Sequence, residues 1–232
     1  MINKLAKYYM LIIIATITSC SQNNNQSTEI NWGYNYFPID TTSSKIYKIT
    51  HIHIDAPAGV FDTTVYYEKQ IITEQFKDNE GRTAYRIYKY KADTQDNQWT
   101  QDSLWWLAIT QFELIVYQNN KPYVKLSFPI EENKQWDGNK YNADTTQTYT
   151  VTNFQQPYTI NGNTYNNTIT VLHKNISTEI NKDYEAEIYA KNIGLIYSVT
   201  KQLYSSYSIG QGIPIEDRIE TGDMWFTQLI NQ

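Results

Sequence analysis

Three residues near the start of the chain have types and a spacing that suit metal chemistry. In His51-Ile52-His53-Ile54-Asp55, two imidazoles and a carboxylate alternate with isoleucines. Alternate side chains of a β-strand share a face, so His51, His53 and Asp55 would point the same way. Such a set could bind zinc or copper, with His173 as a remote fourth ligand. With only three histidines in the chain, we favour the alternative, a hydrated strand face, and predict no metal or cofactor.

Carboxylates form a second candidate site. Asp183, Glu185 and Glu187 alternate along one segment, and Glu131 is followed by Glu132. Paired carboxylates hydrolyse glycosides at separations of about 5 or 6.5–9.5 Å, and they bind calcium where a turn adds carbonyl oxygens. The sequence shows no supporting loop, no nucleophile elbow and no glycine-rich phosphate loop. We therefore predict a hydrated strand face, no catalytic residues and a protein that is not an enzyme.

Aromatic residues form the third candidate. The chain has 6 Trp and 21 Tyr, and Trp105, Trp106 and Trp136 could stack on a sugar or line an apolar ligand cavity. Aromatic side chains also fill the interiors of β-proteins, because each one buries a large area and keeps a polar tip. The sequence favours packing in a core or an interface, and leaves ligand binding as the alternative.

The elements that must position these residues are strands. Beyond residue 30 the chain is dense in Tyr, Ile, Val, Trp and Thr, which suit a pleated surface. Asn161-Gly162 marks a tight hairpin, and short connections favour antiparallel pairing. The predicted strands are 45–55, 63–76, 83–91, 104–117, the hairpin 158–165, 168–174, 184–190, 194–204 and 218–230. We predict one all-β domain over residues 31–232, an antiparallel meander forming a strongly curved sheet, an open barrel or a sandwich.

A short motif occurs twice. Phe37-Pro38-Ile39-Asp40 recurs as Phe128-Pro129-Ile130-Glu131. Proline fixes φ and removes a backbone donor, so it suits a corner where a strand joins a sheet. The two copies indicate either two similar strand starts or two similar halves, about 31–122 and 123–232.

These motifs resemble those of a group of Bacteroidetes secreted proteins and lipoproteins of unknown function. In that group a Phe-Pro-Leu segment leads through a glycine to a Trp and a Tyr, and a later Tyr-Ala-x-x-Val-Gly-Leu-Val element closes a hairpin. The counterparts here are the two Phe-Pro-Ile segments, Trp136, and Tyr-Ala-Lys-Asn-Ile-Gly-Leu-Ile at 189–196. Thr42 and Asn133 stand in place of the glycine, and Lys45 in place of the first tryptophan. The resemblance implies an exported all-β lipoprotein and brings no known activity.

The N-terminus supports export. Two lysines precede an apolar run at 8–17 that is too short to span a bilayer, which needs about 20 residues. Ile17-Thr18-Ser19-Cys20 resembles the lipobox of bacterial lipoproteins, which implies cleavage before Cys20 and lipidation of that residue. Residues 1–19 are then a signal peptide and 20–30 a flexible linker. Two or more acyl chains anchor a protein stably to a membrane, and lipidation would use the only cysteine in the chain.

Charge and local motifs narrow the location and partners. The net charge of −5 gives no electrostatic reason to bind nucleic acid. Residues 21–25 lack the acidic side chains that favour surface export in such families, which points to the periplasmic side of the outer membrane. Four sites also resemble the Bacteroidetes O-glycosylation pattern of Asp, then Ser or Thr, then a small or aliphatic residue. They are Thr41, Thr63, Ser103 and Thr145.

Taken together, these features predict a membrane-anchored lipoprotein with a non-enzymatic binding or structural role in the cell envelope. Its partner would be an envelope protein, a glycan or a lipid. The alternative is a carrier or binder of an apolar ligand or glycan in an aromatic-lined concave sheet. An interior cavity of the size of a ligand pocket, roughly 300 Å³ or more, distinguishes the carrier from a solidly packed domain.

Overall fold

The computed structural model describes residues 31–95, 98–206 and 212–231. The predicted signal peptide and the whole predicted linker, with the lipidation site Cys20, lie outside these residues. The described strands are β1 (Ser44–Asp55), β2 (Val60–Lys77), β3 (Thr83–Ala92), β4 (Thr100–Ile109), β5 (Glu113–Gln118), β6 (Lys121–Ser127), β7 (Gln135–Asp137), β8 (Thr148–Ile160), β9 (Asn163–Ser177), β10 (Asn181–Ala190), β11 (Gly194–Tyr204) and β12 (Thr221–Asn231). Three short 3₁₀ helices accompany them within the described ranges: η2 (Tyr34–Tyr36), η3 (Ala56–Ala58) and η4 (Ile215–Asp217). None of the helices in this part of the chain has the length and apolar character needed to cross a membrane.

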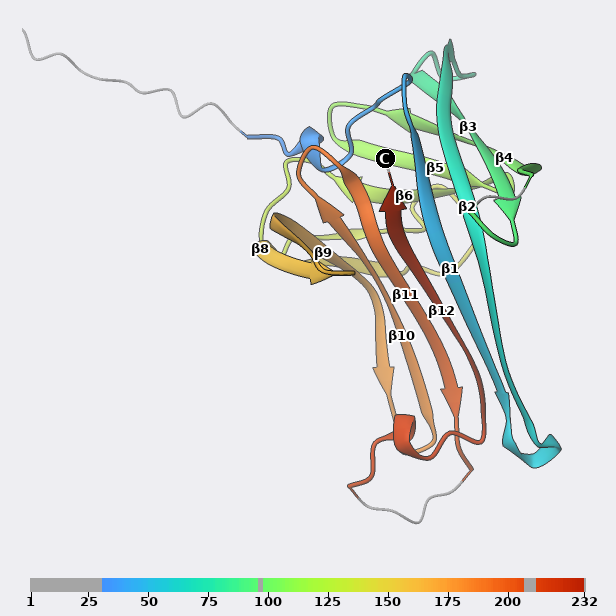
Figure 1. Cartoon of the computed structure of the whole chain (residues 1–232). Coiled ribbons are helices and arrows are strands. Elements are labelled where there is room, and N and C mark those ends of the chain that lie inside the picture. Colours follow the sequence, from blue (N-terminus) through green and yellow to red (C-terminus); the bar gives the residue numbers. More distant parts are fainter. Residues whose placement is uncertain (1–30, 96–97, 207–211, 232) are drawn as a thin grey trace, which may run out of the picture. The chain divides into compact units, whose positions relative to one another are not determined.

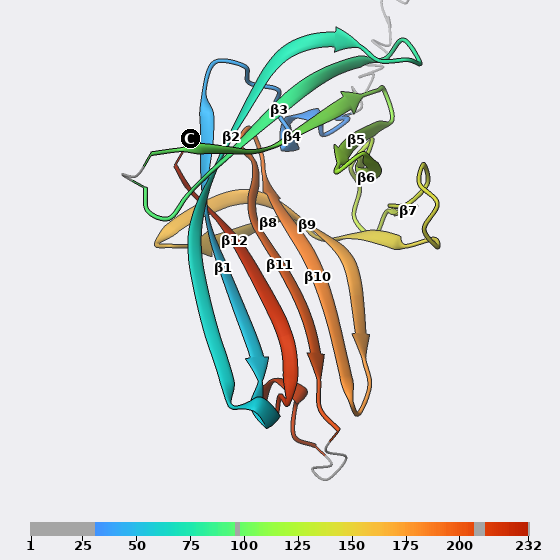
Figure 2. The ribbon, with the colours of Figure 1, turned by 90° about the vertical axis from the view of Figure 1, so that its right-hand side faces the viewer.

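All twelve strands belong to one antiparallel sheet (Figures 1 and 2). Their order is β6-β5-β4-β3-β2-β1-β12-β11-β10-β9-β8-β7, so that β1 and β12 pair at its centre, with Ile49 opposite Thr227. The predicted all-β meander and its strong curvature are confirmed. Of the predicted forms, the strands adopt the open barrel, because they make a single nearly closed sheet and not the two sheets of a sandwich.

The two edge strands of the sheet, β6 and β7, come together at a seam. The backbone N–H of Val124 donates to the carbonyl oxygen of Gly138 at 2.9 Å. The indole Nε1 of Trp136 donates to the carbonyl oxygen of Val124 at 2.7 Å, and the Asn142 amide donates to that of Pro122 at 2.8 Å. These bonds satisfy some of the backbone N–H and C=O groups of the two edge strands, which would be unpaired in an open sheet.

The N-terminal segment 31–39 covers one end of the barrel. Tyr36 is 3% exposed, and Trp32 and Phe37 pack against the main core. The Ile130 N–H donates to the Trp32 carbonyl oxygen at 3.0 Å, so both Phe-Pro-Ile segments lie at this end. The similarity of the two halves that contain these segments stays a prediction.

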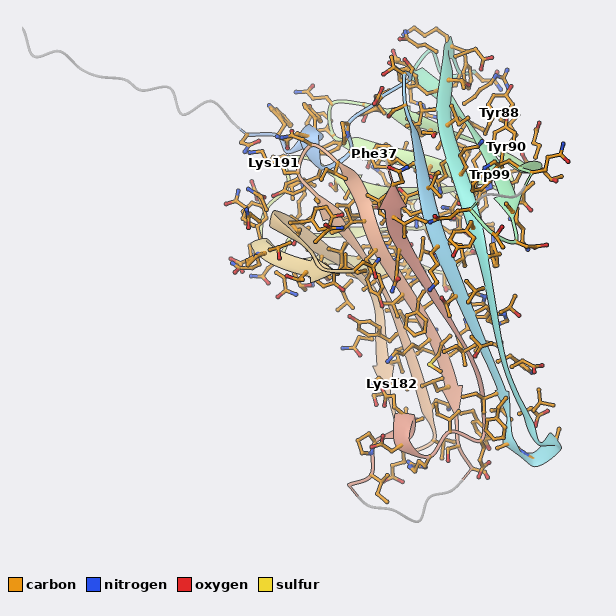
Figure 3. All side chains as sticks on the ribbon, viewed as in Figure 1. Phe37, Tyr88, Tyr90, Trp99, Lys182 and Lys191 are labelled. Atoms are coloured by element: carbon orange, nitrogen blue, oxygen red, sulfur yellow. The ribbon has the colours of Figure 1, made fainter. Side chains whose placement is uncertain are left out.

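The long strands continue past the closed part of the barrel. Figures 1 and 2 show β1, β2 and β10–β12 running on to the end of the molecule that carries η3 and η4. Figure 3 places Phe37 near the covered end and Lys182 far along the long strands. The barrel therefore has a covered end and an end that opens onto the concave face of these strands.

One predicted strand, 104–117, is in fact two. The Thr110 hydroxyl accepts hydrogen bonds from the backbone N–H groups of Phe112 at 3.2 Å and Glu113 at 3.0 Å. Such side-chain bonds to the backbone stabilise a turn, and they reverse the chain between β4 and β5. The sequence pattern does not predict this turn, because the residues around it are apolar and favour strands.

Candidate functional site

The interior of the barrel holds two adjoining cavities. We call the one nearer the covered end, of about 80 Å³, the inner chamber, and the other, of about 290 Å³, the outer chamber. Both are lined by Gln70, Trp105, Gln118, Lys125, Glu187 and Leu195. The inner chamber adds Phe37 and Lys45, and the outer chamber adds Trp225 and Thr200 from the long strands. The shared lining makes the two chambers one continuous interior.

A buried ionic network forms one wall. The Lys125 Nζ lies 2.7 Å from a Glu187 carboxylate oxygen, and the Tyr189 hydroxyl donates to the other oxygen at 2.5 Å. The His173 Nδ1 lies 3.1 Å from Glu185 Oε1, and its Nε2 lies 3.3 Å from Glu187 Oε2. Lys125, Glu187 and His173 are 8%, 9% and 2% exposed. Buried charges need such partners, because an unpaired one carries a large desolvation cost.

Two β-bulges place the cations of this network. The register between β5 and β6 shifts between Leu114 and Ile115, which leaves Lys125 as an extra residue. The register between β9 and β10 shifts in the same way, and His173 is the extra residue there. A bulge re-aims a side chain that strict alternation would direct elsewhere. The ring of Tyr149 stacks on His173 with centroids 3.8 Å apart.

A second ion pair lies across the cavity. Lys89 Nζ is 2.8 Å from Glu68 Oε2, and the Gln70 amide donates to the other oxygen of Glu68 at 2.7 Å. The same Nζ lies 3.4 Å from the centroid of the Trp105 ring, a cation–π contact. The Trp105 Nε1–H is buried and has no hydrogen-bond partner among the described residues. A buried donor of this kind is costly in free energy.

Electrostatics keep the carboxylates of the network ionised. Burial alone would raise the pKa of Glu187, but Lys125 and His173 outweigh it and hold that pKa well below its usual range. Burial would likewise lower the pKa of His173, but Glu187 and Glu185 raise it. The pKa of Glu185 is lowered too, since its bond to His173 outweighs burial. A general acid at neutral pH needs a raised carboxyl pKa, which neither glutamate has.

The predicted histidine group is brought together only in part. His51 Nε2 and His53 Nδ1 lie 2.7 and 2.9 Å from the same Asp223 oxygen, and these side chains are 30–46% exposed. Asp55 turns away and accepts a bond from the Ala58 N–H at 3.3 Å, while His173 belongs to the buried network. Within the described ranges, no group of three or more His, Cys, Asp or Glu residues is arranged to hold a metal ion.

The three candidate tryptophans have different environments. Trp105 lines both chambers. Trp106 faces the opposite side of the sheet, where it stacks on Tyr117 with centroids 3.4 Å apart, and Trp136 lies at the seam. Trp225, which sequence reasoning did not single out, lines the outer chamber and stacks on His51 at 4.6 Å. Only one of the three therefore belongs to the candidate site.

The remaining predicted residues lie mostly at the surface. Glu131 and Glu132 are exposed, and Asp183 pairs with Lys174 at 2.6 Å. The hydrated face predicted for Asp183, Glu185 and Glu187 is wrong for Glu187, because the curvature of the sheet turns it into the barrel. Thr41, Thr63 and Thr145 are exposed and Ser103 is half-buried. Their modification stays a prediction.

Sequence reasoning missed the lysines that define the site. Lys125 stands between Val124 and Leu126, and Lys89 between Tyr88 and Tyr90. A single charge inside an apolar or aromatic strand is a signal that a charged partner faces it, since lysine is rarely buried unpaired. Glu68 lies on the neighbouring strand β2, but Glu187 is far from Lys125 in the sequence, and local patterns identify neither pairing.

No protein-family model matches the chain, and neither a curated protein nor a solved structure shows significant similarity to it.

Proposed function

We propose that this protein is a non-enzymatic binding protein of the cell envelope that holds a small hydroxylated ligand, one sugar unit of a glycan, inside its barrel. The observation that carries the proposal is the continuous interior cavity, with charged pairs, amides and Trp105 in its walls. Ligand pockets span roughly 300–1,000 Å³. An outer chamber of about 290 Å³ therefore suits one ring and not a long chain.

The lining favours a sugar over an aliphatic ligand. Polar side chains contribute most of the outer chamber: Glu68, Gln70, Lys89, Gln118, Lys125, Glu185, Glu187, Ser198, Thr200 and Thr227. An alkyl chain would displace water from these groups without replacing its hydrogen bonds, at a cost in free energy. A sugar supplies hydroxyl groups to them and an apolar ring face to Trp105 or Trp225. Of the predicted ligands, a glycan therefore fits better than an apolar molecule.

The same walls support binding and not catalysis. Glu185 and Glu187, the paired carboxylates inside the barrel, are each held ionised by cations. A glycosidase needs one carboxyl group that carries a proton at working pH. His173 is 2% exposed and lies behind these side chains, where a substrate would not reach it.

The anchor at Cys20 completes the proposal. We expect the chain expressed in a bacterial host to incorporate an alkyne-labelled palmitate and to fractionate with membranes. Cys20→Ser removes the only thiol and should abolish both the label and the membrane fraction, because two or more acyl chains supply the anchorage. Labelling that survives the substitution would contradict the lipoprotein assignment.

The matched pair Trp105→Ala and Trp106→Ala tests the binding site. The two residues are adjacent, but Trp105 lines the cavity and Trp106 faces the other side of the sheet. We expect a sugar identified on a glycan array to bind Trp105→Ala at least about tenfold more weakly, which is 1.4 kcal/mol, because a ring contact is lost. Calorimetry on the full chain in detergent should show unchanged affinity for Trp106→Ala. Equal losses in both variants would place binding outside the cavity.

A second candidate function, docking of an envelope protein, rests on the outer face of β2–β4. Tyr88, Tyr90 and Trp99 gather there (Figure 3). Lys69 Nζ lies 5.3 and 4.8 Å from the Tyr90 and Trp99 ring centroids, and Leu104 is 44% exposed. Aromatic residues are enriched in protein interfaces. Two results together would favour docking over sugar binding. A protein would crosslink to this face in intact membranes, and the full chain would bind no sugar.

A further inference from the structure

Lys45 brings a third lysine to the cavity. It lies near the start of β1, opposite Gln70 on β2, and lines the inner chamber. Its Nζ donates a hydrogen bond to the Ile193 carbonyl oxygen and lies 5.9 Å from the centroid of the Phe37 ring. The ammonium group is thus held at the covered end of the barrel, where the Lys45 side chain is half-buried, whereas Lys89 and Lys125 are 6% and 8% exposed.

Lys45 differs from those two lysines in its charge balance. Lys89 and Lys125 each lie within 2.8 Å of a glutamate oxygen. Among the described residues, no carboxylate oxygen lies within ion-pair distance of the Lys45 Nζ. An ammonium group has three N–H donors, and the described residues give this one a single acceptor, the Ile193 carbonyl oxygen.

Asp40 at the rim of the inner chamber does not supply the missing partner. Its carboxylate accepts bonds from the Thr42 N–H at 2.8 Å, the Thr42 hydroxyl at 2.7 Å and the Ser43 hydroxyl at 2.6 Å. Burial lowers the pKa of Lys45 to about 8, and the charge of Asp40 opposes this only in part. At neutral pH the chamber therefore contains a protonated amine without a direct counter-ion.

We infer that the inner chamber binds the carboxylate of an acidic sugar, with Lys45 as its counter-ion and the sugar ring in the outer chamber beside Trp105. This inference rests on the proposed function and specifies its ligand class. The volume of about 80 Å³ admits a group of a few atoms but not a ring. The amides of Gln70 and Gln118 line the same chamber and add donors, and charge-assisted bonds to a carboxylate are the strong ones.

Calorimetry with matched sugars tests the inference. Glucuronate and glucose differ in the carboxylate, as do galacturonate and galactose. We expect the full chain in detergent to bind the better of the two acids at least about tenfold more tightly than its neutral counterpart. Lys45→Met should reduce this ratio to about one. Its affinity for the neutral sugar should stay within twofold of the wild-type value. Lys48→Met is the control, because Lys48 lies on the same strand with its side chain on the opposite face, and it should keep the full ratio.

The outcomes separate the inference from the proposed function. Equal binding of acidic and neutral sugars to the wild-type chain would overturn the role of Lys45 and leave sugar binding standing. A preference that survives in Lys45→Met, with an unchanged melting temperature, would also overturn it. Failure of the wild-type chain to bind any sugar of either kind would overturn both. A wild-type ratio near one overturns the inference without any variant, and the melting temperature of Lys45→Met shows whether that variant is folded.

Discussion

Lys125→Met should lower the free energy of unfolding by about 3–5 kcal/mol, the usual cost of removing one partner from a buried ion pair. Methionine is close to lysine in length, so packing changes little, but Glu187 stays in the barrel with its main cation gone. Lys125 and Glu187 are 8% and 9% exposed, so water in the chamber reaches Glu187 over a small area and replaces the lost partner poorly. Urea denaturation at pH 7 measures the loss.

Two comparisons show whether the charge is the cause. Lys121 pairs with Asp144 at the surface, where both side chains are more than 40% exposed. Lys121→Met should therefore cost less than about 1 kcal/mol. The lowered pKa of Glu187 means that its stabilisation is present above the unfolded pKa of about 4.3 and is lost as pH falls. In Lys125→Met, protonation of Glu187 removes the unpaired charge, so the difference from wild type should narrow towards pH 4. A difference independent of pH would point to packing instead.

Trp136→Ala should cost about 3–5 kcal/mol, as large aromatic truncations in cores do. Its indole packs against the main core, edge to face with Tyr149 at 6.0 Å, and donates across the seam to the Val124 carbonyl oxygen. The substitution therefore removes core volume and one of the bonds that join the two sheet edges. Equilibrium unfolding in urea gives the cost.

Trp136→Phe separates the two contributions. Phenylalanine keeps an aromatic ring in the core but has no N–H for the seam, so we expect a loss of about 1–1.5 kcal/mol, the net value of one hydrogen bond. Hydrogen exchange of the Val124 amide, which donates to Gly138, should become faster in both variants. Equal stability losses in the two variants would mean that the seam bond, and not the packing, dominates.

Local patterns predict the strands well where one face is apolar and the register is regular. The predicted segment 45–55 is β1 with one residue added, because Tyr47 and Ile49 alternate with polar residues without interruption. Patterning fails at 104–117, where the Thr110 side chain ends a strand inside an apolar run. The choice between a barrel and a sandwich is also beyond local patterns, since it depends on the pairing of β1 with β12 and on the seam.

The candidate site is less accessible to sequence reasoning than the fold. The alternation of His51 and His53 correctly places them on one face, but their partner Asp223 comes from the other end of the chain. Lys125 and His173 reach the interior through bulges, which no periodic pattern reveals. Glu187 shows the same limit, because its burial follows from the curvature of the sheet and not from its neighbours in sequence.

The central pairing of β1 with β12 also determines the order in which the chain can fold. Contacts between residues far apart in sequence slow folding, because the entropy of closing the loop is lost before the contacts form. β1 is made early, but Ile49 on β1 meets its partner Thr227 on β12 only after all the strands between them have been made. Until β12 is made, β1 and β11 each present an unpaired edge, so the sheet remains in two separate parts. The centre of the sheet, which is continuous in the folded protein, is therefore among the last parts that can form.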